Sequence, residues 1–231
     1  MSQVPAYSPV RWPDASEASP LLYYITDRRQ FPGDEADRRK RVVEKIMECG
    51  AAGVDYIQLR EKDLSGSMLE ELAMEAIEAI SPYYPTKLLI NSRSDIALAS
   101  GAHGVHLPAN DLPASEARVI FARAGIIHPV IGVSVHSAQE TAYAEAHGAD
   151  FAVFGPVFEK EERAAPHGLE QLRSACHRPG MISAPMPVLA LGGVTVDNAA
   201  ACRKAGAAGI AGIRLFQENN VANIVRKLKS L

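Results

Sequence analysis

The segment spanning residues 129–158 decides the fold, and it reads PVIGVSVHSAQETAYAEAHGADFAVFGPVF. Val130 to Ser134 is a short apolar run with β-branched residues, which is typical of a strand buried on both faces. Ser137 follows, and Glu140 stands three residues after it in a spacing that predicts the first turn of a helix. The apolar run from Phe151 to Phe154 predicts a second buried strand. The segment is therefore expected to form a strand–helix–strand unit with parallel strands.

The same alternation of apolar runs and amphipathic segments continues along the chain. A Gly-Ala pair precedes four of the apolar runs at intervals of about fifty residues, which matches two strand–helix units. In each pair the glycine suits the left-handed cap that ends a helix, and the alanine permits close approach to the sheet. The pairs are Gly50-Ala51, Gly101-Ala102, Gly148-Ala149 and Gly206-Ala207. The expected strands are Leu21 to Thr26, Tyr56 to Arg60, Lys87 to Asn91, Gly104 to Leu107, Val130 to Ser134, Phe151 to Phe154, Val188 to Leu191 and Gly209 to Ile213.

Eight strands that alternate with helices predict an α/β protein with a closed (β/α)8 TIM barrel, in a single domain over residues 21–231. The alternative is an open, doubly wound sheet, but that sheet has two edge strands, and no strand at either end is short or polar. Residues 1–20 contain four prolines and no periodic pattern. We expect them to form a flexible N-terminal extension in which Trp12 docks on the barrel. A lid over the active site is the alternative.

Composition limits the class of protein. The chain has 231 residues, of which 47% are hydrophobic, and a formal net charge of -3, which indicates one sizeable core and argues against a nucleic-acid partner. No apolar run is long enough to span a membrane. The three cysteines, Cys49, Cys176 and Cys202, show no ligand or redox spacing, which is typical of the reducing cytoplasm. We expect a cytoplasmic protein, and the sequence leaves open whether it forms a homo-oligomer.

The second strand leads to a group of polar and cationic residues. In a barrel of this kind, catalytic side chains lie at the carboxyl ends of the strands and in the loops that follow. Gln58 and Arg60 share one face of the strand, and Lys62 comes directly after them. Because arginine and lysine suit phosphate oxygens, and an unpaired inward cation is costly, these residues predict an anion-binding site. The alternative is a salt bridge with Glu61 or Asp63 at the rim.

The next three strands each lead to a polar candidate. Asn91 ends the third strand and could bind a heterocycle or cap the following helix. His106 lies on the fourth strand, and Asp111, in the loop after it, could bind Mg²⁺ or be an ordinary loop carboxylate. His136 follows the fifth strand. Its imidazole titrates near neutral pH and suits a general acid or base, although a histidine hydrogen-bonded at a helix start is the alternative.

The last two strands end in residues suited to a phosphate. Gly192 and Gly193 follow the seventh strand, and the eighth runs into Ile213 and Arg214. Loops at these two positions commonly bind phosphate through backbone N–H groups, and paired glycines allow close approach of an anion. The alternative is that these glycines only end a strand. It is weaker because residues suited to a phosphate follow both of the last two strands.

Six segments, taken in order, resemble the thiamine phosphate synthase superfamily from Leu21 to about Phe216. The segments are QLREK at 58–62, LLIN at 88–91, GVHLP at 104–108, GVSVHS at 132–137, FGPVF at 154–158 and ALGGVTVDNA at 190–199. The members of this superfamily are (β/α)8 barrels, so the resemblance and the periodicity agree. Two of its branches are relevant to this chain.

The first branch is thiamine phosphate synthase, which joins a pyrimidine pyrophosphate to a thiazole phosphate with the help of Mg²⁺. The resemblance implies that Gln58, Arg60 and Lys62 hold the pyrophosphate end. It also implies that Asn91 and Ser134 lie near the pyrimidine. The residues that would line the thiazole phosphate pocket are Gly193, Ile213 and Arg214.

The second branch is thiazole tautomerase, which moves protons to convert a carboxythiazole phosphate to its aromatic tautomer and needs no metal. A histidine in a VHS segment, here His136, is its implied acid/base. The chain departs from the synthase pattern, because synthases have Asn-Asp where this chain has Asn91-Ser92, and the aspartate is a metal ligand. His106 and Asp111 are retained, with Pro108 in place of a glycine.

Two further departures lie near the phosphate sites. The loop at 159–168, EKEERAAPHG, is acidic where synthases have threonines and a lysine, and Arg214 stands where they have a serine. We therefore expect a thiazole tautomerase, an isomerase without a cofactor, with His136 as general acid/base and a thiazole phosphate as its small-molecule partner. The alternative is an active synthase, a transferase that uses Asp111 and Mg²⁺. A third hypothesis is a non-catalytic regulator that binds a phosphate ligand.

Overall fold

The computed structural model describes residues 19–80, 85–158, 167–177 and 185–231. Trp12 and the acidic stretch after residue 158 lie outside the described residues. The strands are β1 (Leu21–Ile25), β2 (Tyr56–Leu59), β3 (Lys87–Asn91), β4 (Gly104–Leu107), β5 (Val130–Val135), β6 (Phe151–Phe154), β7 (Val188–Ala190) and β8 (Gly209–Gly212). The helices are the 3-10 turn η1 (Arg28–Gln30), α1 (Glu35–Ala52), α2 (Gly66–Ala79), α3 (Ser94–Ser100), α4 (Ala114–Arg123), α5 (Ala138–Ala146), α6 (Gly168–Cys176), α7 (Val196–Lys204), α8 (Arg214–Gln217) and α9 (Val221–Lys229).

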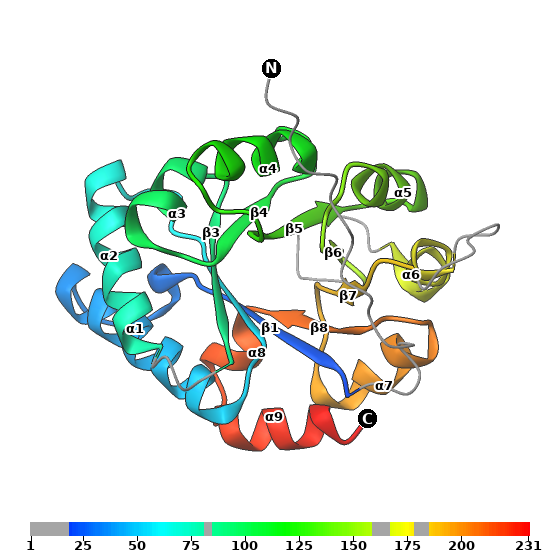
Figure 1. Ribbon diagram of the computed structural model, residues 1–231. Coiled ribbons are helices and arrows are strands. Elements are labelled where there is room, and N and C mark those ends of the chain that lie inside the picture. The colour runs from blue at the N-terminus through cyan, green and yellow to red at the C-terminus, as the bar shows by residue number, and fades with distance from the viewer. Residues whose placement is uncertain (1–18, 81–84, 159–166, 178–184) are drawn as a thin grey trace.

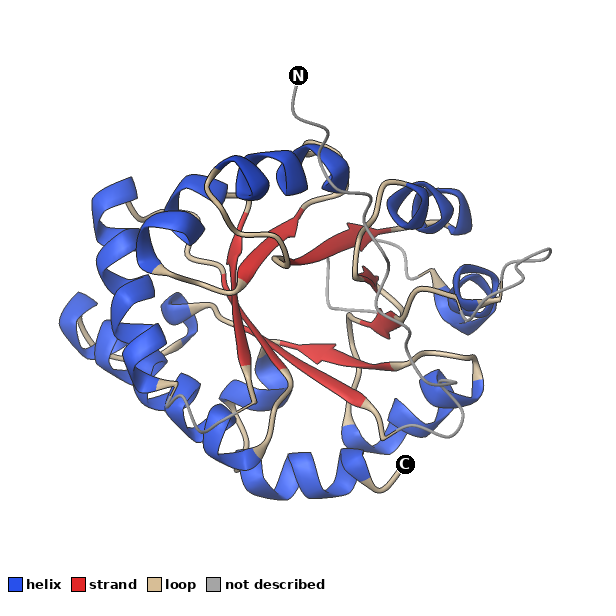
Figure 2. Cartoon of the chain, viewed as in Figure 1, coloured by secondary structure: helices blue, strands red, loops and turns tan. Residues whose placement is uncertain are grey.

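The strands form one closed parallel barrel. Each strand pairs with the next in sequence, and β8 pairs with β1, with Leu22 opposite Ile210. Figures 1 and 2 show the ring of strands inside a layer of helices. All eight predicted strands are present, so the predicted (β/α)8 fold is confirmed and the open sheet is excluded.

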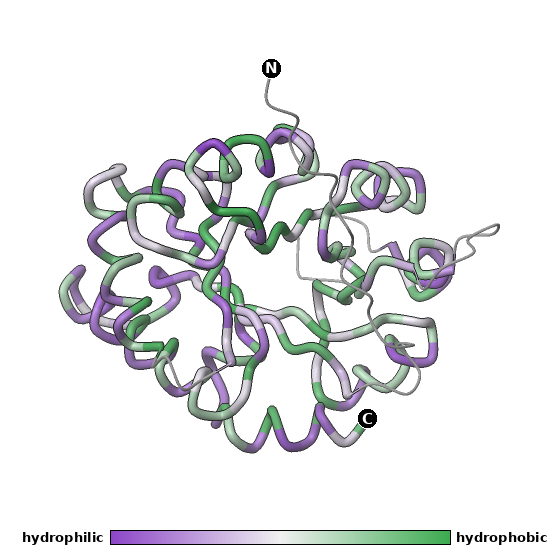
Figure 3. The backbone as a smooth tube through the Cα atoms, in the orientation of Figure 1, coloured by the Kyte–Doolittle hydropathy of each residue, from purple (hydrophilic) through white to green (hydrophobic). Residues whose placement is uncertain are grey.

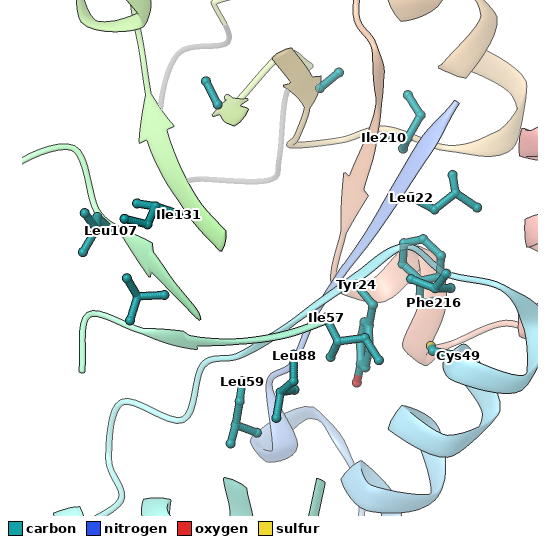
Figure 4. Close-up of a cluster of buried hydrophobic side chains, with 14 of the residues drawn as sticks. Leu22, Tyr24, Cys49, Ile57, Leu59, Leu88, Leu107, Ile131, Ile210 and Phe216 are labelled. Atoms are coloured by element: carbon teal, nitrogen blue, oxygen red, sulfur yellow. The ribbon is translucent and has the colours of Figure 1, made fainter. Parts of the chain in front are cut away.

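The outward-facing side chains of the strands form the main core, between the barrel and the helices. Tyr24 of β1 lies beside Ile57 and Phe216 (Figure 4), and its ring centroid is 5.9 Å from that of Phe216. Leu22, Ile57 and Leu88 are fully buried in the same cluster. Because successive residues of a strand point to opposite faces, the residues between them must fill the inside of the barrel.

A smaller apolar cluster fills the interior of the barrel. Tyr56 and Phe151 stack with their ring centroids 4.8 Å apart, and Tyr23 packs edge-on against Phe151 at 5.3 Å. Gly132, beside these rings, leaves room for them, because a Cβ there would lie 2.6 Å from Phe151 Cζ. This aromatic plug closes the barrel below the ends of the strands and supports the side chains one layer above it.

The helices bury one face each. In α9 the buried residues are Val221, Ile224, Val225 and Leu228, which is the spacing of a single helical stripe. Figure 3 shows the corresponding alternation of hydrophobic and hydrophilic residues along the helices. Among the helices of the described ranges, none combines the length and the apolar character that crossing a bilayer requires.

Three details differ from the sequence-based expectations. Gly50 lies inside α1, and the left-handed cap is Gly53, because the helix continues for almost one more turn before Val54 N–H binds the Cys49 carbonyl. The other three expected glycines, at 101, 148 and 206, do have positive φ. The short helices η1 and α8 were not predicted, since three or four residues are too few to show a periodic pattern.

Candidate active site

Four polar side chains lie one layer above the aromatic plug, nearer the carboxyl ends of the strands. Each follows, by two positions in its strand, a residue of the interior cluster or a glycine beside it. They are Gln58 of β2, Asn91 of β3, His106 of β4 and Ser134 of β5. The Gln58 amide donates to Asn91 Oδ1 at 2.9 Å, and His106 Nε2 lies 2.9 Å from Ser134 Oγ. The structure therefore brings together all four residues that the sequence placed at these strand ends. Asn91 does not cap α3, because the N-cap is Arg93.

His106 is held on both sides of its ring. Its Nδ1 lies 3.1 Å from the Tyr23 hydroxyl, and its Nε2 faces Ser134. Burial, and to a lesser extent the positive charge of Arg60, lower the pKa of His106 to about 3. A neutral imidazole has one donor and one acceptor, so one hydroxyl donates to the ring and the other accepts from it. The Tyr23–His106–Ser134 chain is thus a neutral hydrogen-bond relay from the plug to the mouth.

Sequence reasoning missed Tyr23. The residue is fully buried, and burial raises the pKa of its hydroxyl, so the hydroxyl keeps its proton. The alternation of residues along β1 could have identified Tyr23, because it places the hydroxyl inside the barrel, where a buried polar atom needs a hydrogen-bond partner. The identity of that partner was not readable, since His106 is 83 positions away in the sequence.

Arg60 and Lys62 are not paired with their acidic neighbours. Glu61 and Asp63 instead bind the guanidinium of Arg28, at 3.1 Å and 2.8 Å. Among the described residues, no carboxylate lies within 4.0 Å of either Arg60 or Lys62. The rim salt bridge that was the alternative to an anion site is therefore wrong for both cations.

A pocket of about 380 Å³ adjoins this layer and is lined by Lys62, Asn91, Ser92 and Pro108, among others. Ser92 has a φ of 60°, a left-handed conformation that asparagine and aspartate adopt more readily than serine. Its hydroxyl accepts from the Asn91 amide at 3.2 Å. Ser92 thus stands next to the polar layer without contributing a charge.

Asp111 lies in the loop after β4. Its Oδ1 accepts the backbone N–H of Leu112 at 2.8 Å, so it has the ordinary loop contact that was its alternative role. Within the described ranges, His, Cys, Asp and Glu form no group of three or more that could hold a metal ion. Mg²⁺ usually needs only one or two carboxylates when substrate phosphates and waters complete its shell. One carboxylate with one oxygen engaged therefore fits Mg²⁺ that arrives with a diphosphate.

The second pocket lies over β7 and β8 and measures about 520 Å³. All four residues predicted for the phosphate line it, namely Gly192, Gly193, Ile213 and Arg214. The two glycines have φ of 95° and 64°, a left-handed turn that glycine adopts without strain. Arg214 is exposed at the first position of α8, so its charge reaches the pocket from solvent.

His136 is exposed just after β5. Its Nδ1 lies 2.6 Å from the Gly155 carbonyl, and since a carbonyl only accepts, Nδ1 carries the proton. In the neutral ring Nε2 is then the free acceptor. The backbone N–H of His136 donates to Glu140 at 2.7 Å, and the ring of His167 lies 5.8 Å away. Sequence reasoning did not single out His167.

The loop after β6 connects His136 with the glycine pocket. Gly155 accepts from His136, and the next residue, Pro156, packs so closely on Gly192 that a Cβ there would lie 2.6 Å from the proline Cα. Val157 N–H donates to the Leu191 carbonyl at 2.8 Å. The imidazole and the glycine turn therefore belong to the same end of the barrel and share one supporting loop.

Comparisons with known proteins identify the family that carries this arrangement. The profile of the thiamine monophosphate synthase family matches residues 22–216. The chain belongs to the thiamine monophosphate synthase family. A thiamine-phosphate synthase of Chlorobium luteolum is 38% identical over 85% of this chain and 84% of its own. One of Methanoculleus marisnigri is 35% identical over 90% and 93%.

A solved structure supports the same assignment. The thiamine phosphate pyrophosphorylase of Pyrococcus furiosus superposes with a TM-score of 0.72 at 32% identity, over 91% of this chain and 94% of the other. The resemblance inferred from six sequence segments is confirmed, and the chain is an enzyme of this family in thiamine biosynthesis. The relatives carry the synthase name, so they support the synthase alternative better than the expected tautomerase.

Proposed function

We propose that this thiamine monophosphate synthase family member is itself a thiamine-phosphate synthase. The observation that carries the proposal is the pair of cations Arg60 and Lys62, which lack carboxylate partners among the described residues and lie beside the Gln58–Asn91 layer. Unpaired cations at a rim suit a diphosphate. The substrates would be a pyrimidine that carries a diphosphate and a thiazole that carries a phosphate.

In this reaction the bond between the pyrimidine methylene carbon and the diphosphate oxygen breaks, and the thiazole nitrogen bonds to the same carbon. The diphosphate leaves with the electron pair of the broken bond, so Arg60 and Lys62 would stabilise the charge that develops on it. Gln58, Asn91 and Ser134 would orient the pyrimidine, and His106 would fix the Ser134 hydroxyl. The phosphate of the thiazole would lie in the pocket of Gly192 and Gly193, which holds the nitrogen in place for attack.

Asp111 would be the residue that holds Mg²⁺, together with the oxygens of the diphosphate. When bound, it would neutralise part of the charge of the leaving diphosphate. Ser92 supplies no carboxylate to this ion, so only Asp111 would hold it from the protein side. Arg60 and Lys62 would then contribute a larger share of the diphosphate-binding energy than in a site with two carboxylates.

The test is the formation of thiamine phosphate from the two substrates, with and without Mg²⁺. Because a hydrogen bond to a charged group is worth about 1.5–3 kcal/mol, Arg60→Met should raise KM for the pyrimidine diphosphate about ten- to hundredfold. Arg39→Met is the matched control, since Arg39 pairs with Glu71 and Glu75 between α1 and α2, outside the barrel. Absence of thiamine phosphate under all conditions would contradict the proposal.

A second candidate is thiazole tautomerase, and the fixed tautomer of His136 favours it. The Gly155 carbonyl leaves Nε2 free to take a proton at the mouth, and this chemistry needs no carboxylate at position 92. If tautomerisation is the activity, His136→Ala should lower its rate about 10²–10⁴-fold. His147→Ala is the matched control, because His147 Nδ1 also lies beside a backbone carbonyl, that of Tyr143, but at the opposite end of α5.

The two assays also address the regulator hypothesis. Turnover of the carboxythiazole phosphate alone would select the tautomerase, and thiamine phosphate formation would select the synthase. Thermal stabilisation by a thiazole phosphate without turnover in either assay would leave the non-catalytic regulator.

A further inference from the structure

The loop after β2 alternates charge in the order Arg60, Glu61, Lys62 and Asp63. Two acidic side chains next to two cations would normally compete with an anionic ligand. The structure prevents that competition through Arg28, a residue of η1 that lies beyond β1 and that sequence reasoning did not select.

Arg28 binds three carboxylates with one guanidinium. Its Nε lies 2.7 Å from Glu35, and its Nη1 lies 3.1 Å from Glu61. Asp63 accepts from Nη1 and Nη2 at 2.8 Å and 3.0 Å, a two-pronged contact. Arg28 is only 3% exposed, and the Glu61 side chain that it binds is 1% exposed, so water does not reach that ion pair.

Glu61 is the carboxylate that most needs a partner. Its side chain is 1% exposed, and burial raises its pKa, although hydrogen bonds from Thr26 and Arg28 act in the opposite direction. The Thr26 hydroxyl and the Arg28 backbone N–H both donate to it. The Thr26 oxygen in turn accepts the backbone N–H of Arg60 at 3.0 Å. Glu61 also lines the pocket that Lys62 lines, but its two oxygens are engaged by Thr26 and Arg28.

The two cations have no carboxylate partner among the described residues, unlike Glu61 and Asp63, which are paired with Arg28. Lys62 lines the pocket beside Asn91, and Arg60 lies close enough to His106 for its charge to act on that imidazole. We propose that Arg28 is a positioning residue for diphosphate: it binds Glu61 and Asp63, and thereby leaves Arg60 and Lys62 free for the ligand. This inference rests on the proposed synthase function.

The test is calorimetric binding of inorganic pyrophosphate, with Mg²⁺, to the full chain. In Arg28→Met the freed carboxylates should turn to Arg60 and Lys62, and pyrophosphate should bind about tenfold more weakly. The triple variant Arg28→Met, Glu61→Gln, Asp63→Asn removes the competing charges and should restore affinity to within about threefold of wild type. Arg39→Met, which breaks a comparable two-carboxylate contact between α1 and α2, should bind as wild type does.

A merely structural role predicts a different result. If Arg28 only held the loop together, the triple variant would bind as weakly as Arg28→Met, and that outcome would overturn the inference. Equal binding by wild type and Arg28→Met would overturn it as well. In turnover, Arg28→Met should raise KM for the pyrimidine diphosphate and leave KM for the thiazole phosphate unchanged, because that phosphate lies over β7 and β8.

The test also covers a variant that does not fold and a wild-type protein that does not bind pyrophosphate. If Arg28→Met does not fold, Arg28→Lys replaces it, since lysine keeps the charge but cannot contact three carboxylates at once. It should weaken pyrophosphate binding less than tenfold, and no weakening would contradict the inference. If wild type itself binds no pyrophosphate, the proposed function fails together with the inference, whereas wild-type binding with an unaffected Arg28 variant defeats the inference alone.

Discussion

His106 differs in kind from His136, although both lie at the mouth. Both ring nitrogens of His106 have hydroxyl partners, and its pKa of about 3 keeps it neutral at physiological pH. His136 is exposed, and its Nε2 has no hydrogen-bond partner within the described residues. We therefore assign His106 to orientation of Ser134, and His136 to any proton transfer that the site performs.

The buried His106 should make the protein sensitive to acid. In the unfolded chain a histidine takes up its proton near pH 6.5, whereas folded His106 does so only at about 3. As the pH falls between these values the unfolded state binds the extra proton, so stability falls by up to about 1.4 kcal/mol per pH unit. Urea unfolding at a series of pH values should show a shallower slope in His106→Asn. An identical slope would mean that His106 is not the group responsible.

The two adjacent tyrosines of β1, Tyr23 and Tyr24, should respond differently to loss of the hydroxyl. Tyr23→Phe leaves His106 Nδ1 buried without a partner and should destabilise the protein by about 1–3 kcal/mol. The Tyr24 hydroxyl is buried and has no hydrogen-bond partner within the described part of the chain. Tyr24→Phe is therefore the matched control, and it should be neutral or stabilising in urea unfolding. A larger loss in Tyr24→Phe than in Tyr23→Phe would contradict this account of the relay.

At the scale of the element, the first residue of β8 must be a glycine for β8 to pair closely with β1. A Cβ on Gly209 would lie 2.1 Å from the Leu21 carbonyl oxygen of the paired strand β1. Gly209→Ala must push the two strands apart where the barrel closes and should cost at least about 1–3 kcal/mol. In Gly66→Ala the nearest atom is the tip of the Arg93 side chain, at 3.4 Å. That control meets no backbone atom and should leave stability nearly unchanged, and equal effects in thermal unfolding would refute the comparison.

The elements were largely predictable because each one carries its own local pattern. The β-branched run of β5 and the Ser137 cap of α5 both occur as expected. The inward positions of Gln58, Asn91 and His106 follow from alternation along a strand. Arg28 was missed because its partners Glu61 and Asp63 lie 33 and 35 positions away, and no local pattern joins η1 to that loop. The choice between the two reactions stays a prediction, which the two assays described above test.

At the scale of the whole molecule, α9 covers the seam where the barrel closes. It contacts α1, α7, α8 and β1, and Lys229 donates to Asp55 at 2.7 Å, while Asp55 also accepts the backbone N–H of Leu22. The last helix of the chain is thereby joined to the first strand and to the turn before β2.

Removal of residues 221–231 should therefore prevent cooperative folding. The four buried aliphatic side chains of α9 contribute about 1.5–3 kcal/mol each, which together is comparable to the ~5–15 kcal/mol net stability of a typical domain. Thermal unfolding followed by circular dichroism should show no sharp transition in the truncated chain. Removal of the exposed residues 230–231 alone should leave the transition unchanged. A sharp transition at the wild-type temperature after the longer truncation would contradict this role of α9.

The loop after β6 also has a consequence for how the two sides of the opening respond to a ligand. Phe158 N–H donates to the Gly192 carbonyl at 3.0 Å, Pro156 packs on Gly192, and the Gly155 carbonyl accepts from His136. A phosphate that displaced the glycine turn would carry this loop with it and so reorient the imidazole. Occupancy of the phosphate side should therefore alter the orientation of the His136 ring through the residues that join the two sides, Gly155 to Phe158.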